Sequence, residues 1–336
     1  MKLQNTPTSA SRARRALLTG FAATAMLGIL SPVMAQDYPS KVIKLVVPYP
    51  PGGATDVIGR VMAQKLSVAL NQQVIVDNRA GAAGSIGAAA VASATPDGYT
   101  LLMGAMTSHS ISAVLYKKVV NFDMEKSFAP IAIVGTVPLV FVVNPAVKAA
   151  TLGEFIALAK LKPGKLSFAS AGNGSPQHLA GEMFQRVAGV QMLHVPYKGS
   201  GPAMTDLMGG QVDSMIETAP AAQAHIKGGK LRAIAAASAQ RIPTLPDVPT
   251  ATEAGLKGFE VSSMFGIAAP AGTPPSIISK ISSALKSILS MQDVKDSMLA
   301  QGVISTYTSP EEATIALHSE STKWAKVIQD GNIKPE

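Results

Sequence analysis

A Pro-Gly-Gly segment between an apolar run and an expected helix carries the residues best suited to bind a small anion. Leu45–Val47 predicts a strand, after which Gly52 and Gly53 allow positive φ and a close approach of the backbone to a ligand. Thr55 and Asp56 suit the first turn of the helix that follows. Free backbone amides and the positive end of the helix dipole would then point at one place, which favours an anionic group.

The sequence leaves two questions open in this segment. The glycines can also be explained as a tight turn, since such turns are common between a strand and a helix. Asp56 can cap the helix, or it can accept a hydrogen bond from a ligand ammonium, which would favour amino acids.

A second glycine-rich segment occurs at residues 171–175, Ala-Gly-Asn-Gly-Ser, ahead of a helix that starts at Pro176. Asn173 and the glycines tolerate left-handed backbone, and Ser175 is a good N-cap. We expect the free amides of Gly172 and Gly174 and the hydroxyl of Ser175 to face a ligand.

The sequence lacks the patterns of an enzyme or of a metal protein. It has no cysteine, its five histidines form no pair at metal-ligand spacing, and it contains no G-x-S-x-G elbow. The glycines of residues 81–87 are spaced G-x-x-G-x-x-G without the acidic residue about 20 positions later that a dinucleotide site needs, so close helix packing explains them better. We therefore expect no catalytic residue, no cofactor and no metal.

The first 35 residues are typical of a secretory signal peptide. A basic stretch precedes the apolar residues 16–30, and Val33-Met34-Ala35 suits cleavage after Ala35. Arg14-Arg15 leaves twin-arginine export open beside the general route, and an uncleaved membrane anchor is the alternative to a signal. We expect a mature chain that begins at Gln36 and lies in the periplasm.

The mature chain is nearly balanced in charge. Without the four basic residues of the leader, 25 Lys and Arg stand against 21 Asp and Glu, a net charge of +4. This excess is too small to indicate nucleic acid as a partner. A chain of about 300 residues is also long enough for its core to split, so we expect two lobes.

Apolar strands alternate with helices along the chain, which predicts parallel βαβ units. The expected strands are residues 42–47, 74–76, 99–103, 131–134, 139–143, 166–169, 192–195, 214–216 and 231–235. The expected helices are residues 55–70, 85–94 and 151–161, one that starts at residue 176, and residues 276–289 and 309–328. Thr151 and Ser309 each open a capping box, and the turn-rich stretch Ile267–Pro275 is a hinge candidate.

Five motifs, in order, resemble the Bug-type solute receptors of tripartite tricarboxylate transporters. They are Pro48–Gly53 with Asp56, Val76–Gly84, Pro96–Leu102, Ala171–Ser175 followed by His178–Glu182, and His194–Gly199. Each motif alone is weak, but together they cover essentially the whole mature chain behind a signal peptide.

The resemblance implies an α/β fold of the two-lobed periplasmic binding protein type (type 2), with a ligand cleft between the lobes and two hinge crossovers. Residues 36–137 and 264–336 would form lobe 1, and residues 138–263 would form lobe 2. The expected cleft residues are Tyr49, Gly52, Gly53, Ala54, Thr55, Asp56, Thr107, Ser108, His109, Ser170, Gly172, Asn173, Gly174, Ser175, His178, Tyr197 and Thr218. In the family, Thr107–His109 would be a cleft-lining loop; the residues themselves also suit a polar helix cap.

The receptor, expected to be a monomer, would close on a small carboxylate or amide-bearing solute and deliver it to membrane transporter subunits. The sequence does not name the solute, which could be a dicarboxylate, a tricarboxylate, an amino acid, an aromatic acid or a nicotinate-like amide. A receptor that feeds a membrane sensor kinase would have the same fold and cleft. An exported α/β hydrolase is a third reading, but the sequence offers no activated nucleophile for it.

Overall fold

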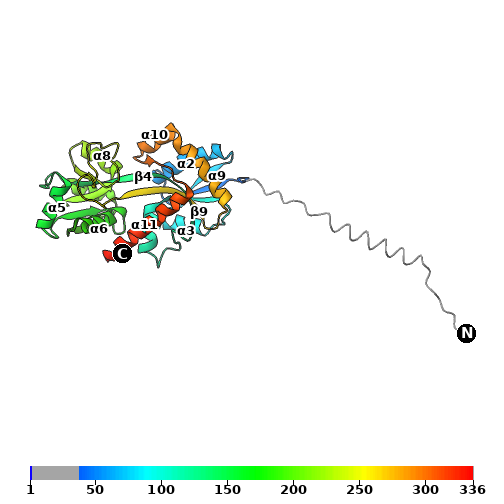
Figure 1. The fold of residues 1–336 in the computed structure, drawn as a ribbon, viewed down its shortest axis with the longest axis horizontal. Helices are drawn as coiled ribbons and strands as arrows, with labels where there is room; N and C mark the ends of the chain where they lie inside the picture. Colours follow the sequence, from blue (N-terminus) through cyan, green and yellow to red (C-terminus); the bar gives the residue numbers. More distant parts are fainter. Residues whose placement is uncertain (2–37, 336) are drawn as a thin grey trace. The chain divides into compact units, whose positions relative to one another are not determined.

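The computed structural model describes Met1 and residues 38–335 of the chain (Figure 1). The expected signal peptide and its cleavage after Ala35 therefore lie outside the described residues. From Pro39 onward the chain forms one compact unit. Among the helices described, none combines the length and apolar character needed to cross a membrane.

A mixed sheet organises this unit. Its strands follow the order β2 (Val74–Asn78), β1 (Ile43–Val47), β3 (Thr100–Ala105), β9 (Ser262–Pro270), β4 (Phe128–Val143), β7 (Ser214–Thr218), β5 (Ser167–Ser170) and β6 (Leu193–Pro196). β8 (Arg232–Ala236) and β10 (Ile304–Ser305) pair with β4 off this path. Pairing is parallel among β1, β2 and β3 in one half and among β5, β6 and β7 in the other, which confirms the expected βαβ units.

The antiparallel strands β4 and β9 join the two halves. β9 pairs with β4 from Phe128 to Pro138, and the last residues of β4, Leu139–Val143, pair with β7. The two separate strands expected at residues 131–134 and 139–143 are thus one strand of 16 residues. Gly135, between the two expected strands, lies at a register shift in the ladder, where a residue without a side chain is easily accommodated.

The turn expected over the hinge candidate Ile267–Pro275 is wrong in its first half. Residues up to Pro270 belong to β9 and are paired with β3 and β4, and only the residues after Pro270 form a turn. The reason is compositional, because small residues such as Ala268 and Gly266 look like a loop in sequence but allow close packing in a central strand. A side chain at Gly266 would approach Ala132 O to 2.9 Å.

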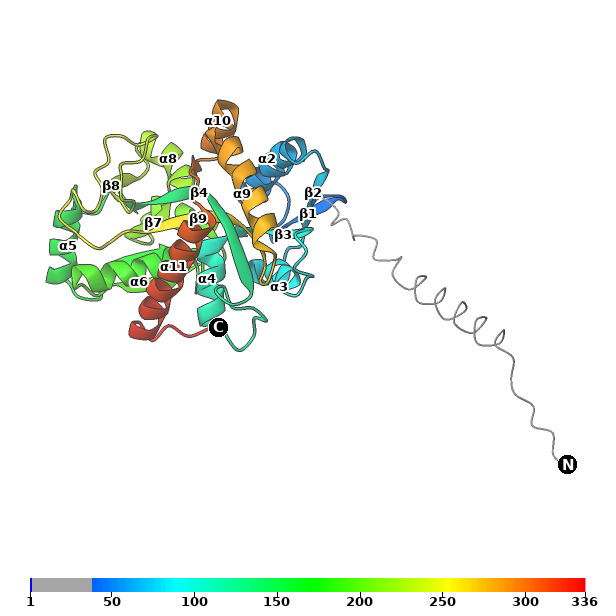
Figure 2. The ribbon, with the colours of Figure 1, turned by 45° about the vertical axis from the view of Figure 1, so that its right-hand side comes forward.

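Helices cover both halves of the sheet (Figures 1 and 2). Around the first half lie α2 (Ala54–Ala69), α3 (Ser85–Ala92), preceded by the short 3-10 turn η1 (Ala82–Gly84), α4 (Met106–Leu115), α9 (Pro275–Ser290) and α10 (Gln292–Ala300). Around the second half lie α5 (Leu152–Leu161), α6 (Pro176–Ala188), α7 (Ser200–Met208) and α8 (Ala219–Lys227). The last helix, α11 (Pro310–Asp330), packs against both α4 and β4.

The predicted capping signals explain two helix starts. At α11 the box is complete, because Ser309 Oγ accepts from Glu312 N (3.2 Å) and the Glu312 carboxylate accepts from Ser309 N (2.7 Å). At α5 the Thr151 hydroxyl accepts from Glu154 N (3.2 Å), but the Glu154 carboxylate accepts from Ala150 N (2.7 Å) instead of Thr151 N.

Aromatic side chains build the apolar core of the second half. The ring of Phe141 on β4 lies 5.1 Å from Phe155 of α5 and 4.7 Å from Phe184 of α6, between ring centroids. Trp324 of α11 is fully buried in the same cluster, whereas Leu317, two turns earlier, packs in the core of the first half. The C-terminal helix therefore contributes to both cores.

Candidate functional site

The expected cleft residues lie around loops that leave the carboxyl ends of parallel strands. In the first half β1 leads into α2 and β3 into α4, and in the second half β5 leads into α6 and β7 into α8. Since parallel strands end at the same edge of a sheet, the loops of each half gather at one edge, which is where α/β proteins usually bind ligands. The sequence predictions fall on this edge in both halves.

Asp56 is held by three protein groups in the first loop. Its Oδ2 accepts from Gly52 N and from Arg60 Nε, both at 2.9 Å, and its Oδ1 accepts from Asn78 Nδ2 at 2.8 Å. Burial would raise the pKa of this carboxyl, but the bonds from Arg60, Gly52 and Asn78 outweigh burial and lower the pKa below its ordinary value. Asp56 thus ties the loop to the start of α2, close to the capping interpretation.

The start of α2 leaves backbone donors open. Gly52 has the expected positive φ of +91°, but the same expectation for Gly53 is wrong, since Gly53 is the extended N-cap with φ −80°. No hydrogen bond in the described part of the chain uses the N–H groups of Gly53, Ala54 or Thr55. Nothing lies within 4 Å of the position that a Cβ of Gly53 would take, so this helix start is open to a small anion.

Thr107, Ser108 and His109 were expected either in a cleft-lining loop or at a polar helix start, and they form the first turn of α4. The buried residues Ile111 and Leu115 continue the apolar face of this helix, and they outweigh the weak helix preference of the polar residues. The Thr107 hydroxyl accepts from Met264 N (3.0 Å) and lies 3.3 Å from Ser262 O, so it fastens α4 to β9.

Tyr49 packs against this turn. Its ring stacks on His109 with 6.1 Å between centroids. Burial raises the pKa of Tyr49 to about 12, against the opposing effect of a hydrogen bond with Ser108. Gly84 lies beside both rings, where an added Cβ would come within 2.9 Å of the imidazole of His109. The tyrosine is therefore neutral and can offer only its hydroxyl to a ligand.

His109 is fully buried, and neither ring nitrogen has a hydrogen-bond partner among the described residues. Burial lowers its pKa to about 4. The ring edge faces Phe122 at 6.2 Å, an apolar neighbour that cannot stabilise a charge. His109 is thus a neutral ring that packs against Tyr49.

The second loop uses its glycine amides internally, contrary to the expectation that they are free. Gly172 N donates to Ser170 Oγ (3.1 Å), and Gly174 N donates to His178 Nδ1 (3.1 Å). Ser175 is the predicted N-cap, since its Oγ accepts from His178 N (3.2 Å). Polar side chains that directly flank a glycine-rich loop compete for its amides, and sequence spacing does not reveal which partner wins.

Two histidines lie beneath the second loop. The rings of His178 and His194 stack with 3.9 Å between centroids at an interplanar angle of 6°. His194 Nε2 lies 2.7 Å from Ser170 Oγ, and Phe168 stacks on its other face at 4.8 Å. Burial lowers the pKa of both histidines to about 4, and for His194 the neighbouring His178 adds to the effect.

Two predicted residues of the second half remain, Tyr197 and Thr218, and their hydroxyl groups differ in whether the protein uses them. Tyr197 Oη donates to Asp206 Oδ2 (2.8 Å), so its hydroxyl is engaged in the protein. Burial, followed by this hydrogen bond and the charge of Asp206, raises the pKa of Tyr197 to about 12. Thr218 is the N-cap residue of α8, but its side chain makes no capping bond, so its half-buried hydroxyl stays open.

Sequence reasoning missed a buried carboxylate next to Thr218. Glu217 is 1% exposed, and its Oε1 accepts from Gln177 Nε2 (3.0 Å) and from Thr218 N (2.6 Å). Its Oε2 is buried without a partner in the residues that the structure describes. Gln177 also reaches Ser200 Oγ (3.4 Å), so the starts of α6, α7 and α8 meet at this point. An acidic residue inside an apolar strand was the available signal.

Helix α4 links the two sets of loops. Its first turn carries Thr107 and Ser108, and at its other end an added Cβ on Gly174 would lie 2.7 Å from the side chain of Leu115. At a rise of about 1.5 Å per residue, the second loop lies about 10 Å along the helix from Ser108. The first turn of α4 and the second loop are thus about the length of a small organic solute apart along this helix.

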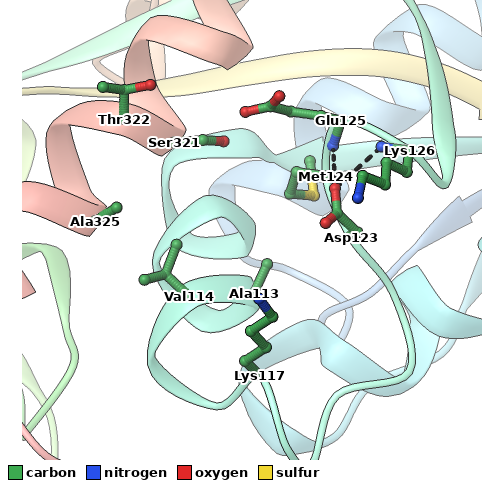
Figure 3. Close-up of a pocket in the computed structure, with 10 residues that line it drawn as sticks. All are labelled: Ala113, Val114, Lys117, Asp123, Met124, Glu125, Lys126, Ser321, Thr322 and Ala325. Atoms are coloured by element: carbon green, nitrogen blue, oxygen red, sulfur yellow. Dashed lines mark hydrogen bonds between the residues drawn. The ribbon is translucent and has the colours of Figure 1, made fainter.

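A separate hollow lies between α4 and α11 (Figure 3). It has a volume of about 320 Å³ and is lined by the end of α4, the loop 123–126 and α11. Asp123 Oδ1 fixes that loop by accepting from Glu125 N (2.9 Å) and Lys126 N (3.0 Å). Its lining contains none of the expected cleft residues, and we assign it no part in solute binding. In the described chain, no three His, Cys, Asp or Glu side chains gather as a metal site.

Comparison with known proteins gives consistent similarities. Residues 58–333 match the family described as the tripartite tricarboxylate transporter family receptor. The chain is 40% identical over 314 residues to protein BugT of Bordetella pertussis, which covers 94% of this chain and 96% of BugT. The structure resembles the periplasmic binding protein BugD, with 35% identity and a TM-score of 0.70 over 89% of this chain and 100% of BugD.

Two further solved structures carry ligands. An R. palustris protein solved with adipate has 32% identity and a TM-score of 0.74, covering 89% of this chain and 100% of its own. MatC from Rhodopseudomonas palustris, solved with bound malate, has 32% identity and a TM-score of 0.70, covering 87% of this chain and 100% of its own.

Proposed function

The chain belongs to the receptor family of the tripartite tricarboxylate transporters, and we propose that it captures a small carboxylate or carboxamide and delivers it to the membrane subunits of such a transporter. Its fold is the two-lobed α/β fold of the periplasmic binding proteins in this family. The observation that carries the proposal is the open start of α2, where the N–H groups of Gly53, Ala54 and Thr55 have no partner in the described chain.

A solute carboxylate at this point would accept backbone hydrogen bonds in the field of the α2 dipole. Arginine is a poor candidate for the same task. Arg60, which lies on α2 itself, already donates to Asp56 and to Asn78 Oδ1 (3.1 Å). The adipate and malate of the two similar structures are both dicarboxylates, which supports a carboxylate as the first solute class to test.

The second half would contact the far end of the solute. The open Thr218 hydroxyl is one donor, and the half-buried loop 171–175 lies beside it on the same edge. The unpartnered Oε2 of Glu217 is an acceptor, and it favours a solute that also carries a donor, such as an amide or a hydroxyl. The second half therefore offers both a donor, the Thr218 hydroxyl, and an acceptor, Glu217 Oε2, and this pair supports the inclusion of carboxamides.

We place the lobe boundary where β4 changes partners, with residues 138–263 as the second lobe. Val137 pairs with Ser263 and Pro138 with Ser262, after which β4 turns to β7. Two antiparallel strands that cross together form a natural hinge, because a small twist of both rotates one half against the other.

A thermal-shift screen tests the function directly. Succinate, malate, adipate, citrate, aspartate and nicotinamide are compared with 1,4-butanediol, a neutral match for succinate. A bound solute at 100 times its Kd should add about 2.7 kcal/mol to the free energy of unfolding. The proposal fails if no carboxylate or carboxamide raises the Tm, or if the diol raises it equally.

Solute binding should also close the two lobes. We expect small-angle scattering to give a smaller radius of gyration with a bound dicarboxylate than without it, because both sets of loops contact the same molecule. The diol serves as the control and should leave the radius unchanged. An equal radius in the bound and free protein would contradict closure but not binding.

A further inference from the structure

We propose that the stacked imidazoles of His178 and His194 position the loop Ala171–Ser175, and that the loop keeps its binding geometry only while His178 is neutral. The consequence for solute capture rests on the proposed function. The positioning itself rests on contacts within the second half alone.

His178 holds one glycine amide of the loop directly, and His194 contacts the serine hydroxyl that holds another. Gly174 N donates to His178 Nδ1 at 3.1 Å, and this bond requires that Nδ1 carries no proton. Gly172 N donates to Ser170 Oγ at 3.1 Å, and the same hydroxyl lies 2.7 Å from His194 Nε2. The two rings therefore hold the loop on both sides of Asn173, the residue at the middle of the loop.

The stack makes the two rings act together. Their centroids are 3.9 Å apart, and Phe168 covers the outer face of His194 at 4.8 Å. A proton on His178 Nδ1 would turn the acceptor of Gly174 N–H into a second donor. Protons on both rings would place two positive charges face to face at a distance where repulsion in a buried site is large.

The charged groups around the two rings could not replace the hydrogen bond that a proton on His178 Nδ1 would break. On α6, the Glu182 carboxylate lies 3.8 Å from His178 Nε2, where it could attract a charged ring but could not replace the acceptor at Nδ1. Arg186, one turn further along α6, donates to Asp330 of α11 at 2.6 Å. β5 contributes the uncharged Phe168 and Ser170, and α4 places Leu115 and Tyr116 against Gly174. Burial of both rings, which lowers the pKa of each to about 4, matches a neutral pair at neutral pH.

Two substitutions at position 178 separate the role of Nδ1 as a hydrogen-bond acceptor from the uptake of a proton by the ring. His178→Asn keeps an oxygen acceptor close to the place of Nδ1 and cannot take up a proton in this range. His178→Phe keeps an aromatic ring for the stack and removes the acceptor. His225→Gln, at the end of α8, is the control histidine outside the loop.

Amide hydrogen exchange of Gly172 and Gly174 by NMR is the readout, given as protection factors so that intrinsic pH effects cancel. At pH 7 we expect His178→Phe to lower the Gly174 protection at least about 10-fold relative to the wild type and to His178→Asn. Between pH 7 and pH 4 the wild type and His225→Gln should lose this protection, whereas His178→Asn should retain it. Near-UV circular dichroism verifies that each variant is folded.

Binding of malate and adipate extends the test to the proposed function. At pH 4 about half of the His178 rings carry a proton in the wild type, so the ratio of affinities at pH 7 and pH 4 should be about 2-fold smaller in His178→Asn than in the wild type. Protonation of the solute itself affects both proteins equally. Equal Gly174 protection in wild type and His178→Phe at pH 7 would overturn the positioning role. Failure of both acids to bind, with the exchange pattern as expected, would count against the proposed function and not against the loop.

Discussion

Gly53→Val should weaken solute binding at least about 100-fold, or about 2.7 kcal/mol, while changing the Tm little. The backbone of Gly53 has φ −80°, which valine adopts without strain, and nothing lies within 4 Å of its Cβ position. The new branched side chain would stand in the open space in front of the amides of Ala54 and Thr55, where we place the solute carboxylate. Calorimetry with malate and adipate measures the loss, and a Tm measurement tests the fold.

Gly153→Val is a matched control for this prediction. Gly153 also lies at a helix start, has no positive φ and has nothing within 4 Å of its Cβ position, but it belongs to α5 and to no loop of the candidate site. We expect it to bind solute like the wild type. Undiminished affinity in Gly53→Val would show that the first loop is only a turn. A large drop in Tm for Gly53→Val, without one for Gly153→Val, would indicate a structural effect instead.

The fold was predictable where one local signal determined an element. Ser309 with Glu312, and Ser175 with Pro176, mark helix starts that the structure places at the same residues. The long β4 was not predictable, because Gly135 and Pro138 resemble a break and only the partner strands show that the ladder continues through them. Tertiary pairing supplied the missing information, and a window of sequence does not contain it.

The candidate site was predictable in its location but not in its hydrogen bonds. Both glycine-rich loops carry the expected residues at the edge of the sheet, and the amides at Gly53 are open as expected. The amides of Gly172 and Gly174 are not open, because Ser170 and His178 reach them first. Glu217 was missed since its meaning depends on Gln177, a residue 40 positions away in sequence.

The free energy of unfolding should fall steadily as pH falls from about 6.5 to about 4. His109, His178 and His194 each have a pKa lowered from 6.5 to about 4, with burial as the largest cause. In this window the unfolded chain binds protons on these histidines, whereas the folded protein keeps their rings neutral. The contribution of the three neutral rings to stability is therefore complete above pH 6.5 and is lost as pH falls. Each histidine adds a slope of about 1.4 kcal/mol per pH unit at most.

One other group opposes this effect, because burial raises the pKa of Glu182 and this carboxyl takes up its proton more readily in the folded protein than in the unfolded chain. Glu182 is present in both the wild type and the His109→Leu variant, so its effect cancels in the difference between them. The pKa of Asp56 is lowered, so this carboxylate stays ionised across the window. His109→Leu removes a fully buried ring whose two nitrogens have no partner in the described chain, and leucine fits an apolar site beside Phe122. We expect urea unfolding at pH 7, 6, 5 and 4.5 to show that the free energy of unfolding falls less steeply with falling pH in His109→Leu than in the wild type, by up to about 1.4 kcal/mol per pH unit. An unaltered slope in His109→Leu would mean that His109 takes up its proton in the folded protein, because only a ring that stays neutral on folding links stability to pH in this way.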